Sequence, residues 1–443
     1  MRVIIIGAGE VGYQIARFLS YEQIDCVVID KDRNKIKRIS EEIDVAVIEG
    51  EGGSSASLRE AEADKADILL AVTDKDETNM IACLLAKAMF KIPRKIARIR
   101  NPEYFFNESL LKNLDIDPAI NPELEIAKAI SRILEAPFAT DIEDFEGGII
   151  KVIGFKIPEN SPIIGKSLKR FNAEINKKFL IGLILRDEKT IIPTGDDVVK
   201  NGDIIYIPVR AGEIQDIISI LGIVRTPAKR IMILGGGKVG FNVASYMESK
   251  ADIKIVEKNL DRCKYLSKNL KRSLILNADG TEQKVLIEEN IGDMDAFVAV
   301  SNNDELNIMV SLLAKKLGAK KNIALVNKTE YIFLAHSLGL QAVLSPRLLT
   351  ASTILRYVRK GDILSLTSIA EGRAEILEGR IGRTSPLINK TLDKAQTKAS
   401  IIGAIIRGND VIIPSGSDRF FENDKLIIFT LRESIKSVEK ILM

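Results

Sequence analysis

Three glycines near the N-terminus, Gly7, Gly9 and Gly12, have the spacing GxGxxG directly after an apolar run and before a helix-like segment. In this setting the first glycine permits a tight turn, the second lets the backbone approach a pyrophosphate, and the third lets the helix pack on the strand. Free N–H groups and the positive end of the helix dipole then hold the phosphates. The same spacing recurs at 235–240, so the sequence predicts two nucleotide-binding turns.

An acidic residue ends the next apolar run after each glycine turn. Asp30 follows the first turn and Glu257 the second, each close to the roughly 20-residue spacing of dinucleotide-binding folds. A carboxylate at this place accepts hydrogen bonds from both ribose hydroxyls and repels a 2′-phosphate, which favours NAD over NADP. Lys31 and Arg33 follow the first acid and weaken that exclusion. The alternative is a Rossmann unit that has lost its ligand, and this alternative is stronger for the second copy.

Three more positions of the first copy are expected at the same cleft. Thr73 and Asp74 follow an apolar strand, at the carboxyl edge where ligands bind in open α/β sheets. Arg98 lies on the next strand and is suited to a two-pronged contact with a phosphate or carboxylate. The alternatives are helix capping by Asp74 or Asp76, and an ordinary ion pair for the arginine. At the matching positions the second copy has Ser301, Asn302 and Val326.

The elements that position these residues follow from an internal duplication. VIIIGAGEVGYQIA from Val3 matches IMILGGGKVGFNVA from Ile231, and IGLILRDEKTIIPTG from Ile181 matches IGAIIRGNDVIIPSG from Ile402. The order of the chain is therefore A1–B1–A2–B2. We predict A1 at 1–124, B1 at 137–222, A2 at 228–346 and B2 at 360–443, with boundaries near Pro137, Thr226–Pro227 and Pro346 to Gly361.

The A and B segments predict different folds. A1 alternates short apolar strands with helices, which is typical of a parallel sheet buried on both faces; the strands are expected at Val3–Ile6, Val27–Ile29, Val45–Val47, Ile68–Val72 and Ile96–Ile99, and helices at Val11–Leu19 and Glu77–Met89. B1 is richer in strands, expected at Ile149–Phe155, Leu180–Leu185, Lys189–Ile192 and Ile204–Val209 before a helix at Gly212–Leu221. Hairpin turns are expected at Arg186–Lys189 and Arg407–Asp410.

Composition excludes several classes of protein. The 443 residues contain 64 Lys and Arg against 61 Asp and Glu, so nothing indicates the concentrated basic face of a nucleic-acid-binding protein. The longest apolar runs, Val3–Ile6 and Ile204–Ile207, are too short to span a bilayer. The N-terminus has no signal-peptide layout. Three widely separated cysteines argue against a zinc or disulfide framework and for a reducing, cytoplasmic compartment.

A catalytic base is hard to find in this sequence. A nicotinamide dehydrogenase needs a proton donor or acceptor near the reacting carbon, commonly His, Lys or Tyr. His336 is the one histidine, and it lies in the helix-like segment YIFLAHSLGL, where a packed or surface role is expected. No catalytic residue and no metal site is therefore predicted, although lysines and tyrosines remain.

The motifs together resemble the TrkA family, the cytoplasmic regulatory subunits of bacterial and archaeal Trk potassium-uptake systems. The resemblance rests on IIIGAGEVG, VIDKD, AVTDKDETNM, IARIRNPEY, ILGGGKVG, AVSNNDELNIM and GAIIRGNDVIIP, and it covers essentially the whole chain. It implies two Rossmann-like, doubly wound parallel-sheet domains (RCK or KTN domains), each followed by a small α+β RCK C-terminal domain. It also implies NAD(H) or adenine nucleotides (ATP or ADP) as ligands, and a homo-oligomeric ring on the inner face of the membrane beneath a TrkH-type pore.

Ligand contacts follow from the resemblance by position. They are Gly7, Ala8, Gly9, Glu10, Val11, Asp30, Thr73, Asp74 and Arg98 in the first copy, and Gly235, Gly236, Gly237, Lys238, Val239 and Glu257 in the second. The family's Gly-Asp-Gly-like turn after strand three is Gly50-Glu51-Gly52 in A1 and Ala278-Asp279-Gly280 in A2, a departure that puts its role in A1 in doubt.

Three hypotheses for function remain at this point. The first is a nucleotide-sensing subunit that gates potassium uptake. The second is a soluble NAD-dependent oxidoreductase, against which the scarcity of histidine counts. The third is a ligand-binding scaffold without a transport partner, whose B domains bind another small molecule.

Overall fold

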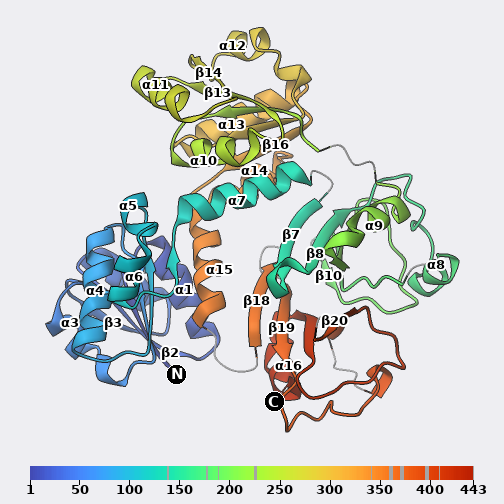
Figure 1. Cartoon of the computed structure of the whole chain (residues 1–443), viewed down its shortest axis with the longest axis horizontal. Helices are drawn as coiled ribbons and strands as arrows, with labels where there is room; N and C mark the ends of the chain where they lie inside the picture. The colour runs from blue at the N-terminus through green and yellow to red at the C-terminus, as the bar shows by residue number, and fades with distance from the viewer. Residues whose placement is uncertain are drawn as a thin grey trace. The chain divides into compact units, whose positions relative to one another are not determined.

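The chain forms two compact units in a computed structural model (Figure 1). The model describes every residue except 137–138, 176–177, 188, 224–226, 341, 359–362, 370–373, 395–398, 409 and 443. The first unit joins Met1–Ser131 with Lys229–Val358, and the second joins Arg132–Ala228 with Arg359–Met443. A1 and A2 therefore fold together, as do B1 and B2. Of the predicted domain boundaries, Pro137, Thr226 and Gly361 lie outside the described residues.

A1 is built on a parallel sheet of six strands in the order β3-β2-β1-β4-β5-β6. Its central strands are buried completely, because Val3 to Ile6 and Ile68 to Ala71 are almost all aliphatic and have helices on both faces. The strands are β1 (Arg2–Ile6), β2 (Asp25–Asp30), β3 (Ala46–Glu49), β4 (Ile68–Ala71), β5 (Arg94–Arg98) and β6 (Ala119–Ile120). The helices are α1 (Glu10–Tyr21), α2 (Arg33–Glu42), α3 (Ser55–Glu60), α4 (Asp76–Ala88), α5 (Pro102–Phe105), α6 (Glu108–Leu114) and α7 (Pro122–Glu135).

A2 repeats this topology, with the strand order β14-β13-β12-β15-β16-β17. Its strands are β12 (Arg230–Leu234), β13 (Asp252–Glu257), β14 (Leu274–Asn277), β15 (Ala296–Ala299), β16 (Lys321–Leu325) and β17 (Ala342–Leu344). Its helices are α10 (Lys238–Met247), α11 (Leu260–Asn269), α12 (Gln283–Glu288), α13 (Asp304–Lys316), α14 (Thr329–Ser337) and α15 (Pro346–Val358). The prediction of two doubly wound parallel sheets is confirmed.

One helix that follows A2 packs on A1 and joins the two domains. Helix α15 follows the last strand of A2, yet it packs on α1 of A1. Its buried residues Ala351, Ile354 and Val358 belong to the same apolar core as Val3 and Ile15 of A1 (Figure 1). Each fully buried Val or Ile contributes about 1.5–3 kcal/mol relative to exposure, so α15 makes the first unit one structure.

B1 and B2 are five-stranded antiparallel sheets with matching strand orders, β10-β9-β11-β8-β7 and β18-β19-β22-β20-β21. B1 contains β7 (Ala139–Phe145), β8 (Ile150–Lys156), α8 (Leu168–Glu174), β9 (Leu183–Arg186), β10 (Lys189–Ile191), β11 (Ile204–Arg210) and α9 (Ile214–Ile220). B2 contains β18 (Ile363–Ile369), β19 (Ala374–Arg380), β20 (Ser400–Arg407), β21 (Asp410–Ile412), β22 (Lys425–Leu431) and α16 (Ile435–Leu442).

The two B sheets share one core. Tyr206 and Phe145 of B1 pack in a single apolar cluster with Phe429 of B2. A methyl group at Gly182 would lie 2.2 Å from the Phe429 ring, so this position accepts only glycine next to that ring. Each copy also contains a partly buried bidentate ion pair, Arg186 with Asp203 in B1 and the matching Arg407–Asp424 in B2.

Sequence reasoning missed the first strand of each B domain and placed some strand ends wrongly. Strand β7 has the sequence ATDIEDF, whose three acidic residues hide the strand pattern. It lies at the edge of its sheet, where charged residues are common. Strand β9 begins at Leu183 rather than Leu180. Hairpins do form at both predicted turns, between β9 and β10 and between β20 and β21.

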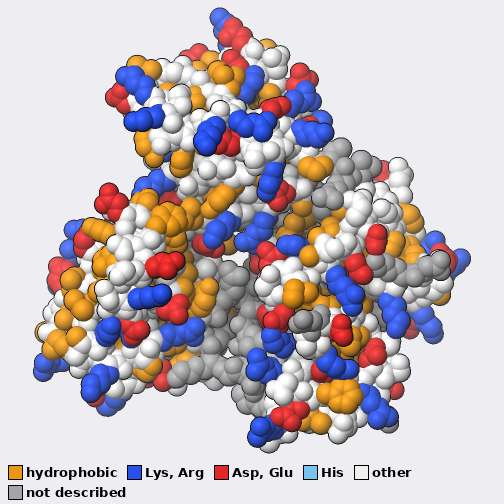
Figure 2. Space-filling view, in the orientation of Figure 1, with side chains coloured by type: hydrophobic (Ala, Val, Ile, Leu, Met, Phe, Trp, Pro, Cys, Tyr) orange, Lys and Arg blue, Asp and Glu red, His pale blue; other side chains and the backbone are white. Residues whose placement is uncertain are grey.

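The surface carries both signs of charge. Lys and Arg side chains are interspersed with Asp and Glu over the face drawn in Figure 2. Over the described parts of the chain, no helix is both long and apolar enough to cross a membrane.

Candidate nucleotide-binding site

The outer glycines of each turn are required by packing. Gly7 has φ +109°, and a Cβ there would lie 3.0 Å from the Thr73 amide nitrogen. A Cβ on Gly12 would lie 1.9 Å from the Gly7 carbonyl oxygen, and on Gly240 2.0 Å from the Gly235 oxygen. These contacts let α1 and α10 begin directly against the sheet.

The middle glycine of each turn has no such requirement. Gly9 has φ −68° and ψ −178°, and Gly237 has φ −60° and ψ −167°, conformations open to any residue. No atom lies within 4 Å of the position of a Cβ at either glycine. The first N–H groups of a helix have no intrahelical partners, and no capping side chain takes their place at α1 or α10. This open, amide-lined backbone is suited to the close approach of a phosphate.

The acid at the end of the second strand of each copy accepts a hydrogen bond from an amide of the glycine turn. Asp30 accepts a hydrogen bond from the Ala8 amide at 2.6 Å and another from the Asp32 amide at 2.9 Å. Glu257 does the same in A2, accepting from the Gly236 amide at 2.7 Å and the Asn259 amide at 2.8 Å. A carboxylate has about four acceptor positions, so both acids retain capacity for ribose hydroxyls.

Thr73 is held by a side chain that sequence reasoning missed. Its hydroxyl and amide both donate to Asn79 Oδ1, at 2.7 and 3.0 Å, and the Asn79 amide group donates to the carbonyls of Thr73 and Arg98. Asn307 makes the same four bonds in A2. Both asparagines are fully buried, and their recurrence at the same position of α4 and α13 was the available signal. They fix the carboxyl ends of two neighbouring strands.

The capping alternative for Asp74 and Asp76 is wrong. Helix α4 has Lys75 at its N-cap with no side-chain cap bond, and Asp74 is exposed. The buried Asp76 accepts hydrogen bonds from the amides of Arg100 and Asn101 instead, at distances of 2.7 to 3.0 Å. It therefore shapes the loop after β5.

Arg98 is not in an ordinary ion pair. Its Nε is buried and has no hydrogen-bond partner within the described structure. Burial lowers the pKa of this guanidinium, and the neighbouring charge of Arg100 lowers it further. A cation held in this state favours an anionic partner.

Residues of both A1 and A2 line one cavity of about 480 Å³, which we name the shared cavity. A2 lines it with Gly237, Lys238 and Val239 of its glycine turn, and A1 with Arg98 and Arg100. The first turn reaches it through Val11. Sequence reasoning placed Arg98 in the first site alone, but the structure places this arginine beside the second turn as well. The sequence alignment matched Arg98 to Val326, but in the sheet its equivalent is Leu325, because Ala97 pairs with Ala71 as Ala324 pairs with Ala299. A2 thus lacks an arginine at this place, and Arg98 of A1 lies beside its glycine turn.

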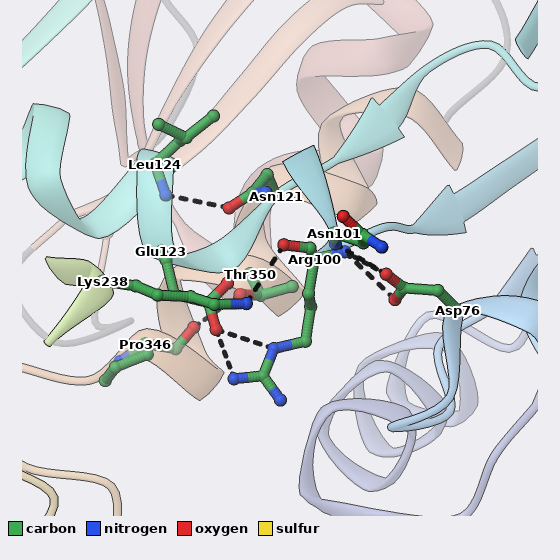
Figure 3. Close-up of polar contacts among 9 residues, drawn as sticks. All are labelled: Asp76, Arg100, Asn101, Asn121, Glu123, Leu124, Lys238, Pro346 and Thr350. Carbon is green, nitrogen blue, oxygen red and sulfur yellow. Dashed lines mark hydrogen bonds and ion pairs between the residues drawn. The ribbon is translucent and has the colours of Figure 1, made fainter. Parts of the chain in front are cut away.

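Sequence reasoning predicted Lys238 but missed three other charged residues of the shared cavity, Arg100, Glu123 and Arg347, because their contacts are long-range. Arg100 donates through Nε to Glu123 Oε1 at 2.6 Å, and its Nη2 contacts the same oxygen (Figure 3). Lys238 donates to the Arg100 carbonyl at 3.3 Å. Arg347, at the start of α15, lies 3.9 Å from Glu10.

The single histidine lies apart from these residues. His336 is in the last turn of α14, and its Nδ1 is 3.1 Å from the Leu340 carbonyl oxygen. It does not line the shared cavity.

Family models match most of the chain. The TrkA-N domain model matches residues 3–122 and 231–346, and the TrkA-C domain model matches residues 152–222 and 376–443. The chain is similar to the Trk system potassium uptake protein TrkA of Halomonas elongata, with 34% identity over 100% of this chain and 98% of the relative. It is also similar to the TrkA homolog 1 of Methanosarcina mazei, with 37% identity over 99% of both chains.

Solved structures resemble the fold at low identity. The GsuK RCK domain has a TM-score of 0.64 at 16% identity and covers 100% of this chain and 94% of its own. A GsuK channel bound to NAD has the same TM-score and identity, covering 99% of this chain and 78% of its own. At this identity the likeness supports the fold alone.

Proposed function

This chain belongs to the TrkA family of Trk potassium uptake proteins, and from that premise we propose that it is a nucleotide-binding regulatory subunit that gates a TrkH-type membrane pore. Its place is in the cytoplasm, on the inner face of the membrane beneath that pore. The ligand of the first site is NAD(H), with ATP or ADP as the alternatives.

The main support for nucleotide binding is the middle glycine of each turn. Gly9 and Gly237 have ordinary backbone angles and empty surroundings, so a ligand that approaches the backbone is the remaining reason for glycine at both positions. We assign the first site to the turn Gly7–Val11 with Asp30, Thr73, Asp74 and Arg98. The second comprises Gly235–Val239 with Glu257. The NAD-bound GsuK structure, which has the same fold, supports the choice of ligand.

Gating requires a ligand whose affinity differs between two arrangements of the domains. The lining of the shared cavity supports this mechanism, because Arg98 and Arg100 of A1 and the first turn of α10 in A2 line it together. These groups would hold one phosphate chain from two domains, so occupancy would favour a fixed arrangement of A1 and A2. A ring of copies would transmit that arrangement to the pore.

Matching apolar residues on A1 and A2 support the homo-oligomer. Ile81 on α4 and Phe106 after α5 are 46% and 67% exposed, and the corresponding Met309 and Phe333 of A2 are 64% and 72% exposed. Large apolar side chains exposed at the same places in both copies are typical of a repeated subunit interface. Met309→Asp should therefore lower the molecular mass measured by light scattering, whereas an unchanged mass would remove this surface from the assembly.

We propose no enzymatic reaction for this chain. His336 is held at the end of α14, away from the glycine turns, and the family is one of potassium uptake proteins. An absence of NADH turnover across a panel of keto and hydroxy acids is expected, and turnover would favour the oxidoreductase hypothesis. Co-purification with a multi-spanning membrane protein would separate the regulatory subunit from the scaffold hypothesis.

The direct test combines binding with ion flux. NAD, NADH, ATP and ADP are titrated against the wild type and Asp30→Ala, and potassium flux is measured with the pore reconstituted. We expect weaker NAD binding in the variant and a nucleotide-dependent flux in the wild type. Undiminished affinity would remove the first site assignment, and tight binding without any change in flux would contradict gating.

A further inference from the structure

We propose that Glu123 is an internal competitor for the shared cavity: its carboxylate holds Arg100 until a ligand phosphate displaces it, so the second site selects strongly anionic nucleotides. This inference rests on the proposed function, because it assumes that the second glycine turn binds a nucleotide. It goes beyond that function by naming the class of ligand, a strongly anionic nucleotide, and the residue that this ligand must displace, Glu123.

The pairing of Glu123 with Arg100 is incomplete. Both guanidinium contacts fall on one carboxylate oxygen, Oε1. The other oxygen, Oε2, is buried and has no hydrogen-bond partner in the described structure. A bidentate pair that used both oxygens would be stronger, and an unsatisfied buried acceptor is unfavourable. A phosphate, with three oxygens and more charge, is therefore able to compete with this carboxylate for Arg100.

Positive charge in the shared cavity exceeds what Glu123 neutralises. Arg98 lines it with an unpartnered buried Nε. Lys238 is engaged with a backbone carbonyl, and Arg347 lies near Glu10 at 3.9 Å. Four cationic side chains thus line the cavity together with one carboxylate, Glu123. Such a surface favours an anion with several charges over the diphosphate of NAD, whose two phosphates carry one charge each.

Glu123 also links the shared cavity to helix α7. It is the second residue of α7, the helix that leads from A1 toward B1, and an acid in the first turn of a helix is stabilised by the helix dipole. At the equivalent place α15 begins with Pro346 and Arg347. Displacement of the Glu123 carboxylate from Arg100 would release the start of α7 from the loop after β5. The carboxylate would remain near the first amides of its own helix. Binding of an anion is thereby coupled to α7.

The test measures ATP and NAD affinity by calorimetry in the full chain carrying Gly9→Ala, which is meant to isolate the second turn. In that background Glu123→Gln should tighten ATP binding about three- to tenfold, because a charge-assisted contact on Arg100 is removed. NAD should gain less than twofold. Glu125→Gln is the matched control, because Glu125 lies on the same helix, pairs with Lys128 at 2.9 Å and does not line the cavity.

A double-mutant cycle makes the assignment specific. The gain from Glu123→Gln should vanish when Arg100→Gln is also present. Unchanged or weaker ATP binding in Glu123→Gln would overturn the inference while leaving the proposed function standing. An absence of any nucleotide binding in the wild type would overturn the proposed function itself. Glu123→Asp, whose shorter side chain retracts the carboxylate, gives the same comparison if the glutamine variant does not fold.

Discussion

The two glycine turns have nearly the same backbone and opposite electrostatic surroundings. Gly7 and Gly235 have φ of +109° and +104°, and the acid below each turn accepts from a turn amide. The first helix position is Glu10 in A1, which lies near Arg38 and Arg347. In A2 it is the exposed Lys238.

Arg262 adds to the positive charge at the second turn. It donates to the carbonyls of Gly236 and Gly237, at 2.5 and 3.2 Å. Packing thus maintains the backbone of both turns, whereas the side chains around them have diverged. We infer that the copies retain one way of holding a phosphate and differ in which nucleotide they hold.

The largest expected effect separates structural glycines from ligand-facing ones. Gly12→Ala and Gly240→Ala should each lower the free energy of unfolding by about 3 kcal/mol or more, because the new Cβ overlaps a carbonyl oxygen at 1.9 and 2.0 Å. Chemical denaturation followed by circular dichroism measures this. Equal stability of either variant and the wild type would show that the turns are less tightly packed than the contacts indicate.

The next effect concerns the acids. Asp30→Asn should weaken NAD binding about 10- to 100-fold, because charge-assisted bonds to ribose are lost while the amide oxygen still accepts from Ala8. Glu257→Gln, the matched change in A2, should leave the NAD affinity of the first site unchanged. Calorimetric titration of both variants checks the comparison. If both variants lose NAD binding, the two turns form one composite site rather than two separate sites.

A third prediction uses the arginine that only A1 contains. Arg98→Met should raise the free energy of unfolding by about 1 kcal/mol, since a buried Nε without a hydrogen-bond partner in the described structure is removed, and it should weaken ATP binding. The second copy already has an apolar residue, Leu325, at the equivalent place in its sheet, and Leu325→Met is the control for a change of side-chain shape. Thermal unfolding with and without ATP measures both effects. Loss of stability on Arg98→Met would mean that the guanidinium is satisfied in the folded protein.

The smallest effect distinguishes the turns after the third strands. The hydrogen bond from Lys258 lowers the pKa of Asp279 from 3.8 to about 2. Because the folded-state pKa is depressed, this contribution is present above pH 4 and is lost as the pH falls toward 2. Lys258 is largely exposed, so the pair is screened by solvent and Asp279→Asn should change the unfolding midpoint by about 2 °C or less at neutral pH. The difference from wild type should disappear near pH 2.

The sequence was sufficient for the local features of fold and site. Short aliphatic runs predicted the parallel strands because those strands are buried on both faces, and the spacing of Gly9 and Asp30 predicted that the turn and the acid would meet. The contact of Glu123 with Arg100 was not predictable, because the first belongs to a helix and the second to a loop that only the tertiary fold brings together. The packing of α15 on A1 was missed for the same reason, since the helix follows A2 in the chain and only the tertiary fold places it on α1.

The most direct test of two separate nucleotide sites is the number of NAD and ATP molecules bound by the wild type, Gly9→Ala and Gly237→Ala, measured by calorimetry. A Cβ at either glycine meets no protein atom within 4 Å, so both variants should be as stable as the wild type. We predict that Gly9→Ala loses NAD and retains ATP, whereas Gly237→Ala loses ATP and retains NAD, each by about tenfold or more in affinity. Unchanged affinities in both variants would contradict the account.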